Sequence, residues 1–219
     1  MKRLAILRPE PGASATLKRA LGLGLDAFSL PLFEIAAVEW KAPDVSGFDG
    51  LLLTSANTVR FGGTALQALR GLPAYAVGEA TAAEARAAGF GIAATGDEGV
   101  ERLLGSIDPA LRLLHLCGRH RTEVQAAQTI TQLAVYGSRA IACVDIGALD
   151  GCVTLIHSPR AAQRLAELAT KRSAIAIAAI SPAATQAAGP GWGSISAADA
   201  PNDDALLALA ARLCENGAR

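Results

Sequence analysis

Residues 51–60 read LLLTSANTVR, and this stretch decides the fold. The three leucines predict a buried strand, which stops at Thr54, Ser55 and Asn57 before a helix-compatible segment begins. A core strand needs no hydroxyl groups at its end. The stretch therefore predicts a strand followed by a helix, with polar side chains between them that either cap the helix or meet a ligand.

The same order of apolar strand, polar end and amphipathic helix recurs along the chain. The clearest apolar runs are LAIL at 4–7, GLLL at 50–53, AYAV at 74–77, LLHL at 113–116, VTLI at 153–156 and IAIAAI at 175–180. Ala-rich stretches with helical spacing, such as ATAAEARAA at 80–88 and AAQRLAELA at 161–169, lie between several of them. This alternation predicts an α/β protein built on parallel sheets.

Strand ends also repeat at a constant distance along the sequence. The same 103-residue offset separates Ser55 from Ser158, Val77 from Ile180 and Phe33 from Tyr136, and it also relates the leucine pairs at 103–104 and 206–207. A constant spacing of strand ends predicts two related halves of about a hundred residues each. The repeat leaves open whether each half folds by itself or exchanges strands with the other.

Composition narrows the class of protein. Of the 219 residues, 51% are hydrophobic and 18% are charged, with 20 basic and 20 acidic residues. A net charge of zero provides no bulk field for nucleic acid or an anionic membrane, so local groups must bind any anion. The start, MKRLAILRPEPG, does not resemble a secretory signal, no apolar run has the length of a membrane span, and the four cysteines form no CxxC pair. We therefore expect a soluble cytoplasmic protein with reduced thiols.

Four predicted strand ends carry hydroxyl groups or glycine, and ligands of open parallel sheets bind beyond such ends. They are Thr54-Ser55-Ala56-Asn57, Gly78-Glu79-Ala80-Thr81, His157-Ser158-Pro159-Arg160 and Ser181-Pro182. The alternative is capping: both Ser-Pro pairs are typical of an N-cap followed by proline, and Thr81-Ala-Ala-Glu84 is typical of a capping box. Both interpretations can hold together, because a hydroxyl group that accepts a capping bond can still donate.

Arginines follow several of these strand ends. Arg8, Arg60, Arg119 and Arg160 are either solvated surface residues or clamps for carboxylates, which the guanidinium group binds through two parallel hydrogen bonds. Other motifs are weaker. The GLGLDA stretch at 22–27 follows a predicted helix and not a strand, so its glycines are expected to end that helix. His115, Cys117 and His120 lack a fourth ligand, so we expect no metal site there.

The ordered set of motifs resembles the uroporphyrinogen-III synthase family. The motifs are LAILRPE, PLFEI, FDGLLLTSANTV, AVGEATAAEARAAGF, LLHLCGRHR, VY, LIHSPRAA, AISPAAT and PNDDALLALA, and they cover nearly the whole chain. The resemblance implies an α/β fold of two flavodoxin-like or Rossmann-like parallel-sheet lobes joined by two extended linkers. The first lobe would be discontinuous, with residues 1–36 and 150–219, the second would span 41–138, and the linkers would be 37–40 and 139–149.

The resemblance also implies the activity. A lyase of porphyrin, tetrapyrrole and haem biosynthesis would cyclise linear hydroxymethylbilane to uroporphyrinogen III in the cleft between the lobes, with inversion of the last pyrrole ring and loss of water. It would act as a monomer on this small molecule, without a cofactor, metal, nucleic acid or membrane. Tyr136, taken to end the strand LAVY, aligns with the family's cleft tyrosine and is the candidate catalytic residue. The candidate substrate-binding residues are Arg8, Thr54, Ser55, Asn57, Gly78, Thr81, Arg119, Ser158, Arg160 and Ser181.

Two departures from the family are visible. Eleven residues separate Cys117 from Thr129, so a helix there would be short. Ser181-Pro182-Ala183-Ala184 has alanine where the family commonly carries threonine, with Thr185 next along the chain. Two other functions also fit hydroxyl-rich strand ends. One is a sugar-phosphate isomerase-like enzyme, for which Glu79 is the candidate base, and the other is a two-lobed sensor that binds anions without catalysis.

Overall fold

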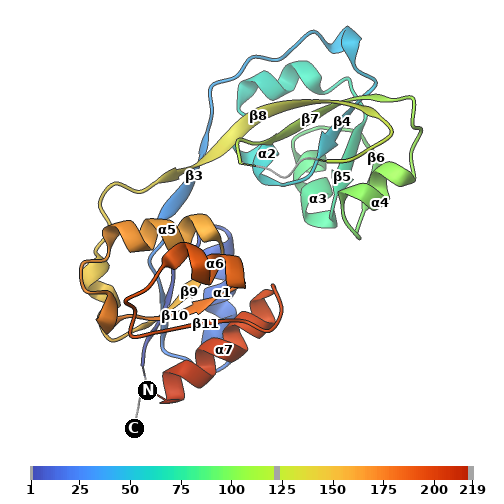
Figure 1. Ribbon diagram of the computed structural model, residues 1–219. Helices are drawn as coiled ribbons and strands as arrows, with labels where there is room; N and C mark the ends of the chain where they lie inside the picture. Colours follow the sequence, from blue (N-terminus) through green and yellow to red (C-terminus); the bar gives the residue numbers. More distant parts are fainter. Residues whose placement is uncertain (1, 121–123, 217–219) are drawn as a thin grey trace. The chain divides into compact units, whose positions relative to one another are not determined.

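The computed structural model describes residues 2–120 and 124–216. The chain divides into two compact units (Figure 1). The discontinuous unit contains the residues up to Glu34 and those from Arg139 onward, and the continuous unit spans Ile35–Ser138. Each unit has its own sheet and its own hydrophobic core.

The discontinuous unit is built on a five-stranded sheet in which every pair of neighbours is parallel. Its order is β11 (Ser194–Ala197), β10 (Ala176–Ala179), β9 (Val153–Ile156), β1 (Leu4–Ile6) and β2 (Ala27–Ser29). The three central strands are buried along their whole length. Continuous apolar runs are expected of such strands, because helices cover both faces of a parallel sheet.

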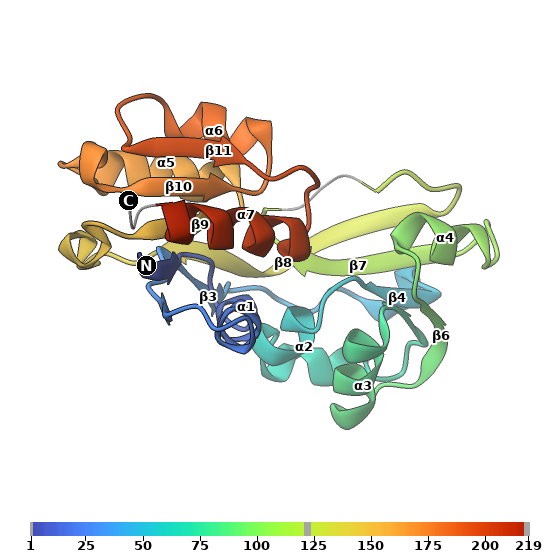
Figure 2. The same cartoon turned by 90° about the horizontal axis from the view of Figure 1, so that it is seen from below.

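Helices cover both faces of this sheet (Figures 1 and 2). On one face α1 (Gly12–Gly22) and α7 (Asp203–Asn216) pack against Leu4, Ile6 and Leu155. On the other face α5 (Pro159–Leu168) and α6 (Pro182–Ala188) pack against residues of opposite parity, such as Ile156 and Ile177. Two short 3₁₀ turns complete the unit, Ile146–Leu149 and Arg172–Ala174.

The continuous unit is built on a six-stranded sheet. Its order is β3 (Phe33–Ala37), β8 (Thr129–Ala140), β7 (Arg112–Gly118), β4 (Gly50–Leu53), β5 (Ala74–Val77) and β6 (Ile92–Gly96). The five strands from β8 to β6 are parallel. The chain passes between the two units within β3 and near the end of β8.

The two faces of this second sheet are covered unequally. One face packs against α2 (Asn57–Phe61), a 3₁₀ turn at Thr64–Leu69 and α3 (Glu79–Ala87). The other face packs against α4 (Val100–Gly105), through Leu103 and Leu104. A further 3₁₀ turn, Val45–Gly47, precedes β4. Between β7 and β8, the described residues 119–120 and 124–128 contain no helix.

The two sheets have one strand order but different chain connections. The order β2-β1-β9-β10-β11 is the flavodoxin-like order 2-1-3-4-5. In the continuous unit β8-β7-β4-β5-β6 has the same arrangement, so β4 corresponds to β9 and β7 to β1. Gly50 and Val153, which begin β4 and β9, are 103 residues apart, as the repeat predicts. The predicted α/β class with two parallel sheets is therefore confirmed.

Two details of the predicted repeat are wrong. Phe33 and Tyr136 are not equivalent positions, because β3 and β8 are neighbours in one sheet and the counterpart of β8 is β2. Tyr136 also does not end a strand, since β8 continues to Ala140.

Residues 139–149, expected as a linker, belong to the discontinuous unit, and 37–40 belong to the continuous one. In the described part of the chain, no helix is both long and apolar enough to cross a membrane.

Candidate functional site

The strand order itself indicates where a ligand would bind. In a flavodoxin-like sheet the connections leave in opposite directions from two adjacent central strands, which opens a crevice beyond their carboxyl ends. These strands are β1 and β9 in the discontinuous unit, and β7 and β4 in the continuous unit. The chain beyond their ends carries Arg8 and Ser158 in one unit, and Thr54 and Arg119 in the other. Polar residues that the sequence predicts at strand ends therefore lie at both crevices.

A cavity of about 440 Å³ lies at the crevice of the continuous unit. Its walls come from the ends of β4, β5 and β7, from α4, from β8 and from the segment between β7 and β8. The lining residues are Thr54, Ser55, Val77, Val100, Glu101, His115, Cys117, Gly118, His120, Val124 and Tyr136. The discontinuous unit places α1 after β1, whereas the described residues after β7 form no helix. We attribute the open space to the lack of a helix in the described residues after β7. The short spacing between Cys117 and Thr129 is consistent with this difference.

Thr54 and His115 form a polar pair in the wall of this cavity. Oγ1 of Thr54 lies 3.0 Å from Nε2 of His115. His115 is only 2% exposed and stands on β7, on the same face of the sheet as Leu113. The hydroxyl group of Thr54 is thus held by a buried imidazole. The apolar strand around His115 indicates that this residue is buried. No local pattern in the sequence pairs it with Thr54, which lies 61 positions away.

Tyr136 reaches the cavity through an irregularity in the sheet. The register between β7 and β8 shifts after Cys117. Cys117 pairs with Ala134, but the next residue, Gly118, pairs with Tyr136, so β8 has one extra residue at this point. The ring of Tyr136 packs over Gly118, where an added Cβ would lie 2.9 Å from Cε2 and 3.2 Å from the hydroxyl oxygen. A glycine is therefore needed for this close approach. Tyr136 therefore lines the same cavity as Thr54 and Ser55.

Four predicted residues of this unit are not part of the cavity lining, namely Asn57, Gly78, Thr81 and Arg119. The backbone N–H of Asn57 donates to Oγ of Ser55 at 3.2 Å, so Ser55 supports the start of α2 as well as lining the cavity. The backbone N–H of the exposed Arg119 donates to the carbonyl of Tyr136 at 2.8 Å. Gly78, with φ of 81°, precedes α3, and Thr81 lies buried within its first turn.

The predicted capping box at Thr81 and Glu84 is wrong. The helix α3 begins three residues earlier than a cap at Thr81 would place it, at Glu79, because Gly78 is the N-cap and adopts a positive φ that turns the chain into the helix. Glu84 instead accepts two hydrogen bonds from the Arg60 side chain, the shorter at 2.8 Å. The side chain of Thr81 is packed inside the unit and does not face solvent.

In the discontinuous unit, both predicted Ser-Pro caps are confirmed. Oγ of Ser158 accepts a bond from the N–H of Ala161 at 3.2 Å, and Oγ of Ser181 accepts one from the N–H of Ala184 at 3.4 Å. Proline follows each cap at the first helical position. The guanidinium group of Arg160 stacks on the ring of Phe33, 4.1 Å from its centroid. Each of these side chains thus has a structural role beside the predicted ligand contact.

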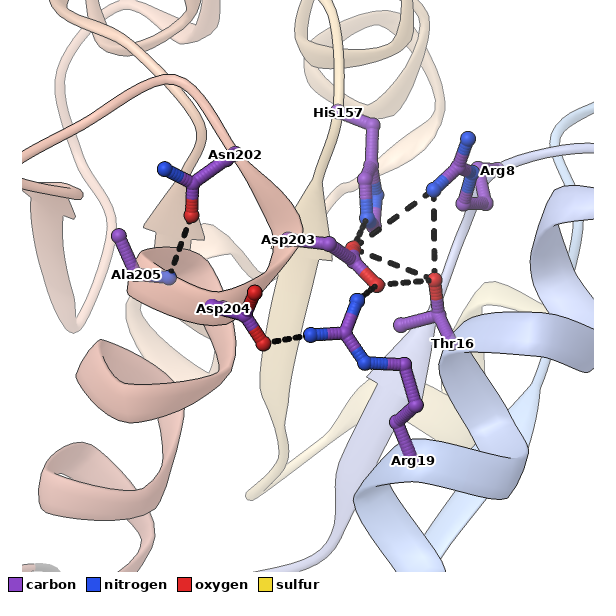
Figure 3. A network of polar contacts seen from close by, with 8 residues as sticks. All are labelled: Arg8, Thr16, Arg19, His157, Asn202, Asp203, Asp204 and Ala205. Carbon is purple, nitrogen blue, oxygen red and sulfur yellow. Dashed lines mark hydrogen bonds and ion pairs between the residues drawn. The ribbon is translucent and has the colours of Figure 1, made fainter. Parts of the chain in front are cut away.

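A network of polar side chains surrounds Asp203, the first residue of α7 (Figure 3). Its carboxylate accepts hydrogen bonds from Thr16 at 3.0 Å and from Arg19 at 2.8 Å, and it contacts Nε2 of His157 at 2.8 Å. Arg8 approaches from the end of β1, with Nη1 at 3.6 Å from Oδ1 of Asp203. Arg19 also pairs with Asp204. The crevice beside β1 and β9 is therefore surrounded by polar and charged groups from α1, α7 and the chain that follows β1 and β9.

The protonation of this network follows from burial and hydrogen bonding. Burial lowers the pKa of His157, as does the charge of Arg8, against the opposing effect of the bond to Asp203. Burial alone would raise the pKa of Asp203, but hydrogen bonds from His157 and Thr16 outweigh it and the pKa is lowered. An ionised carboxylate can only accept, so the proton of the neutral imidazole sits on Nε2. Nδ1 of His157 is then a buried acceptor with no partner among the described residues.

No pattern in the sequence indicates that Thr16, Arg19, His157 and Asp203 lie in one site. His157 immediately precedes Ser158, and Asp203 lies in the PNDD stretch at 201–204, so both belong to motifs that are apparent in the sequence. The pairing joins residues 46 positions apart, which no local pattern reveals. Among residues 2–120 and 124–216, no three metal-ligating side chains gather into a cluster.

Two parallel-stranded sheets of flavodoxin-like order, with polar residues at both crevices, define a two-unit α/β protein. The profile described as "Uroporphyrinogen-III synthase HemD" matches residues 14–208. The chain therefore belongs to the uroporphyrinogen-III synthase family, whose members are cyclising lyases of haem biosynthesis.

Solved structures were compared with this chain as well. The uroporphyrinogen-III synthetase from Helicobacter pylori 26695 is 19% identical, with a TM-score of 0.62 over 97% of this chain and 100% of that chain, and it shares the fold. A mutant uroporphyrinogen III synthase from the extremely thermophilic bacterium Thermus thermophilus is 17% identical, with a TM-score of 0.48 over 99% of this chain and 100% of that chain. A comparison with curated proteins gave no match.

Proposed function

We propose that this chain closes hydroxymethylbilane to uroporphyrinogen III, with inversion of the last pyrrole ring and loss of water. The observation that carries the proposal is the cavity at the β4–β7 crevice, around which the candidate catalytic residue Tyr136 joins Thr54 and Ser55. Membership of the uroporphyrinogen-III synthase family supports this reaction over other uses of the fold.

The chemistry requires little acid–base power from the protein. The carbon–oxygen bond of the hydroxymethyl group breaks, and the electron pair leaves with the oxygen, which takes up a proton to depart as water. The remaining azafulvene cation is delocalised over the pyrrole, and the last ring attacks it through the carbon that already bears its methylene bridge. That older bridge bond then breaks, which leaves a second azafulvene cation on the neighbouring ring. The free α-carbon of the last ring closes on this cation and loses a proton, which balances the proton consumed in forming water. We assign the proton donor to the hydroxyl group of Tyr136. Orientation of the chain is the larger task, since unassisted closure occurs without inversion.

We propose that carboxylates of the substrate are held by many weak contacts. Every pyrrole ring carries one acetate and one propionate, and backbone N–H groups, hydroxyl groups and arginines bind such groups without a basic protein. The proposed binding residues are Arg8, Thr54, Ser55, Asn57, Gly78, Thr81, Arg119, Ser158, Arg160 and Ser181. Ser158 and Ser181 can donate through hydroxyl protons that their caps do not use. Thr81 is buried and its backbone N–H donates to the carbonyl of Gly78 at 3.0 Å, so its contact would require a local rearrangement.

The proposal includes a monomeric, cytoplasmic enzyme that needs no cofactor, nucleic acid or membrane. The four cysteines all carry free thiols, as is usual in a reducing compartment. The alternative isomerase needs a base in the site, and its candidate, Glu79, is exposed and pairs with Arg86 at 2.5 Å. No observation favours this alternative or the anion sensor.

A coupled assay separates the three functions. Hydroxymethylbilane is generated in place by its synthase, this protein is added, and the products are oxidised to porphyrins and resolved into isomers I and III. The proposed enzyme yields isomer III. A sensor or an isomerase would leave only isomer I, from spontaneous closure.

A further inference from the structure

We propose that Gly12, Thr16 and Asp203 together fix the position of the guanidinium group of Arg8, so that it can bind a carboxylate of the ligand. The inference rests on the proposed function for the identity of that ligand. It assigns Gly12, Thr16 and Asp203 as positioning residues, which act on the substrate only through Arg8.

Asp203 orients Arg8 without neutralising it. The nearest oxygen of Asp203 lies 3.6 Å from Nη1 of Arg8, which is beyond hydrogen-bond length. The same carboxylate is already shared by Arg19, Thr16 and His157, all at 3.0 Å or less. Most of its capacity as an acceptor is therefore used by other donors. Arg8 keeps a positive charge that a further anion can satisfy.

Thr16 connects the two charged groups. Its hydroxyl oxygen accepts a hydrogen bond from Nη1 of Arg8 at 3.3 Å, and its own proton goes to Asp203 at 3.0 Å. Thr16 is fully buried in α1, so the hydroxyl group has a fixed position. One hydroxyl can both accept and donate in this way. Thr16 thus fixes the Nη1 end of the guanidinium group beside Asp203.

Gly12 provides the space for the rest of the guanidinium group. An added Cβ on Gly12, the first residue of α1, would lie 2.4 Å from Nε of Arg8 and 2.7 Å from Cζ and Nη2. The guanidinium group therefore lies directly against the backbone at the start of α1. Any larger residue at position 12 displaces it.

The remaining donors of Arg8 are available for a ligand. Within residues 2–120 and 124–216, the hydrogen bonds and ion pairs of its guanidinium group are those of Nη1 with Thr16 and Asp203. Figure 3 shows the second terminal nitrogen directed away from Asp203. The side chain is 35% exposed, so solutes reach it. A planar donor that is fixed at one nitrogen and exposed at another is suited to bind a carboxylate.

The test compares two glycine-to-alanine variants of the same helix. Gly12→Ala displaces Arg8, whereas Gly22→Ala, at the other end of α1, adds a methyl group with nothing within 4 Å. Alanine is favourable in a helix, so both variants are expected to fold. We expect Gly12→Ala to raise the KM for hydroxymethylbilane about tenfold or more, the effect of one charged hydrogen bond, with kcat within about threefold of the parent value. Gly22→Ala should match the parent.

A second pair tests the hydroxyl group of Thr16. Thr16→Val removes the bond to Arg8 at nearly constant volume, and Thr16→Ser restores it. We expect the valine variant to raise KM and the serine variant to recover most of the loss. A raised KM in both variants would mean that packing, and not the hydroxyl group, is responsible, and would overturn the role assigned to Thr16.

A readout independent of turnover separates this inference from the proposed function. The side-chain ¹⁵Nε resonance of Arg8, assigned by its loss in Arg8→Lys, is followed during titration with glutarate as a simple dicarboxylate. It should shift in the parent and in Gly22→Ala but not in Gly12→Ala. If the parent forms isomer III and Gly12→Ala keeps the parent KM, the inference is wrong and the function stands. If the parent forms no isomer III the function is wrong, and an unshifted Arg8 resonance would overturn the inference as well.

Discussion

The hydroxyl oxygen of Thr54, at the end of β4, lies 3.0 Å from Nε2 of the buried His115 on β7. This contact joins the two strands of the crevice at the wall of the cavity. An imidazole that holds a hydroxyl group fixes the hydroxyl's position before a ligand arrives. The pair therefore links the packing of the sheet to the geometry of the candidate site.

Loss of this hydroxyl group should destabilise the continuous unit. Thr54→Val keeps the volume but leaves Nε2 of the buried imidazole without this partner, so we expect about 1–3 kcal/mol less free energy of unfolding. Thr54→Ser keeps the hydroxyl group and should lose less. Chemical denaturation measures both. Equal stability of the valine variant and the parent would show that the contact contributes nothing.

The hydroxyl group of Tyr136 should assist departure of the substrate hydroxyl. We expect Tyr136→Phe to lower kcat roughly ten- to a hundredfold, which is about 1.4–2.7 kcal/mol of barrier. Melting should change little, because the ring remains packed. Turnover at the parent rate would mean that Tyr136 has only a packing role.

Displacement of the Tyr136 ring should have a similar effect with the hydroxyl group still present. In Gly118→Ala the new Cβ would meet the ring at 2.9 Å, so the ring must shift. We expect kcat to fall at least about tenfold, in the range of general acid catalysis. Gly91→Ala, with nothing within 4 Å of the new Cβ, is the control. If both alanine variants turn over equally fast, the position of the ring over Gly118 is unimportant.

Stability should depend on pH through His157 and Asp203. The pKa of His157 is lowered by folding, so the unfolded chain binds the proton more readily, and the free energy of unfolding falls as the pH drops below about 6.5, the ordinary value. Asp203, whose pKa is also lowered, stabilises the fold above about 3.8, and this contribution is lost as the pH falls through its lower folded value. The test is the difference in stability between the parent and His157→Gln from pH 8 to 5. This difference should shrink toward acid, and a constant difference would contradict the assigned protonation.

Periodic and local features of this fold could be predicted from the sequence. The apolar run Leu51–Leu53 and the hydroxyl groups after it are recognisable because a buried parallel strand and its polar end are both contiguous. The Ser-Pro caps at Ser158 and Ser181 were equally local. The offset of 103 residues placed β9 correctly against β4, since each strand has the same position in its own sheet.

Features that depend on three-dimensional proximity or on backbone conformation could not be predicted. The positive φ of Gly78 moved the start of α3 and removed the expected capping box. The shift of register beside Gly118 that lets Tyr136 reach the cavity leaves no pattern in the sequence. The contact of His157 with Asp203 depends on how the last helix returns to the first strand, which no spacing rule reveals.

The isomer composition of the product tests the central claim most directly. Hydroxymethylbilane is mixed with this protein at a concentration that consumes it faster than spontaneous closure, and the oxidised porphyrins are separated by chromatography. We expect mostly isomer III, with its fraction falling toward that of the protein-free control as the protein is diluted. Isomer I alone at every protein concentration, from folded protein with a normal melting transition, would contradict the account.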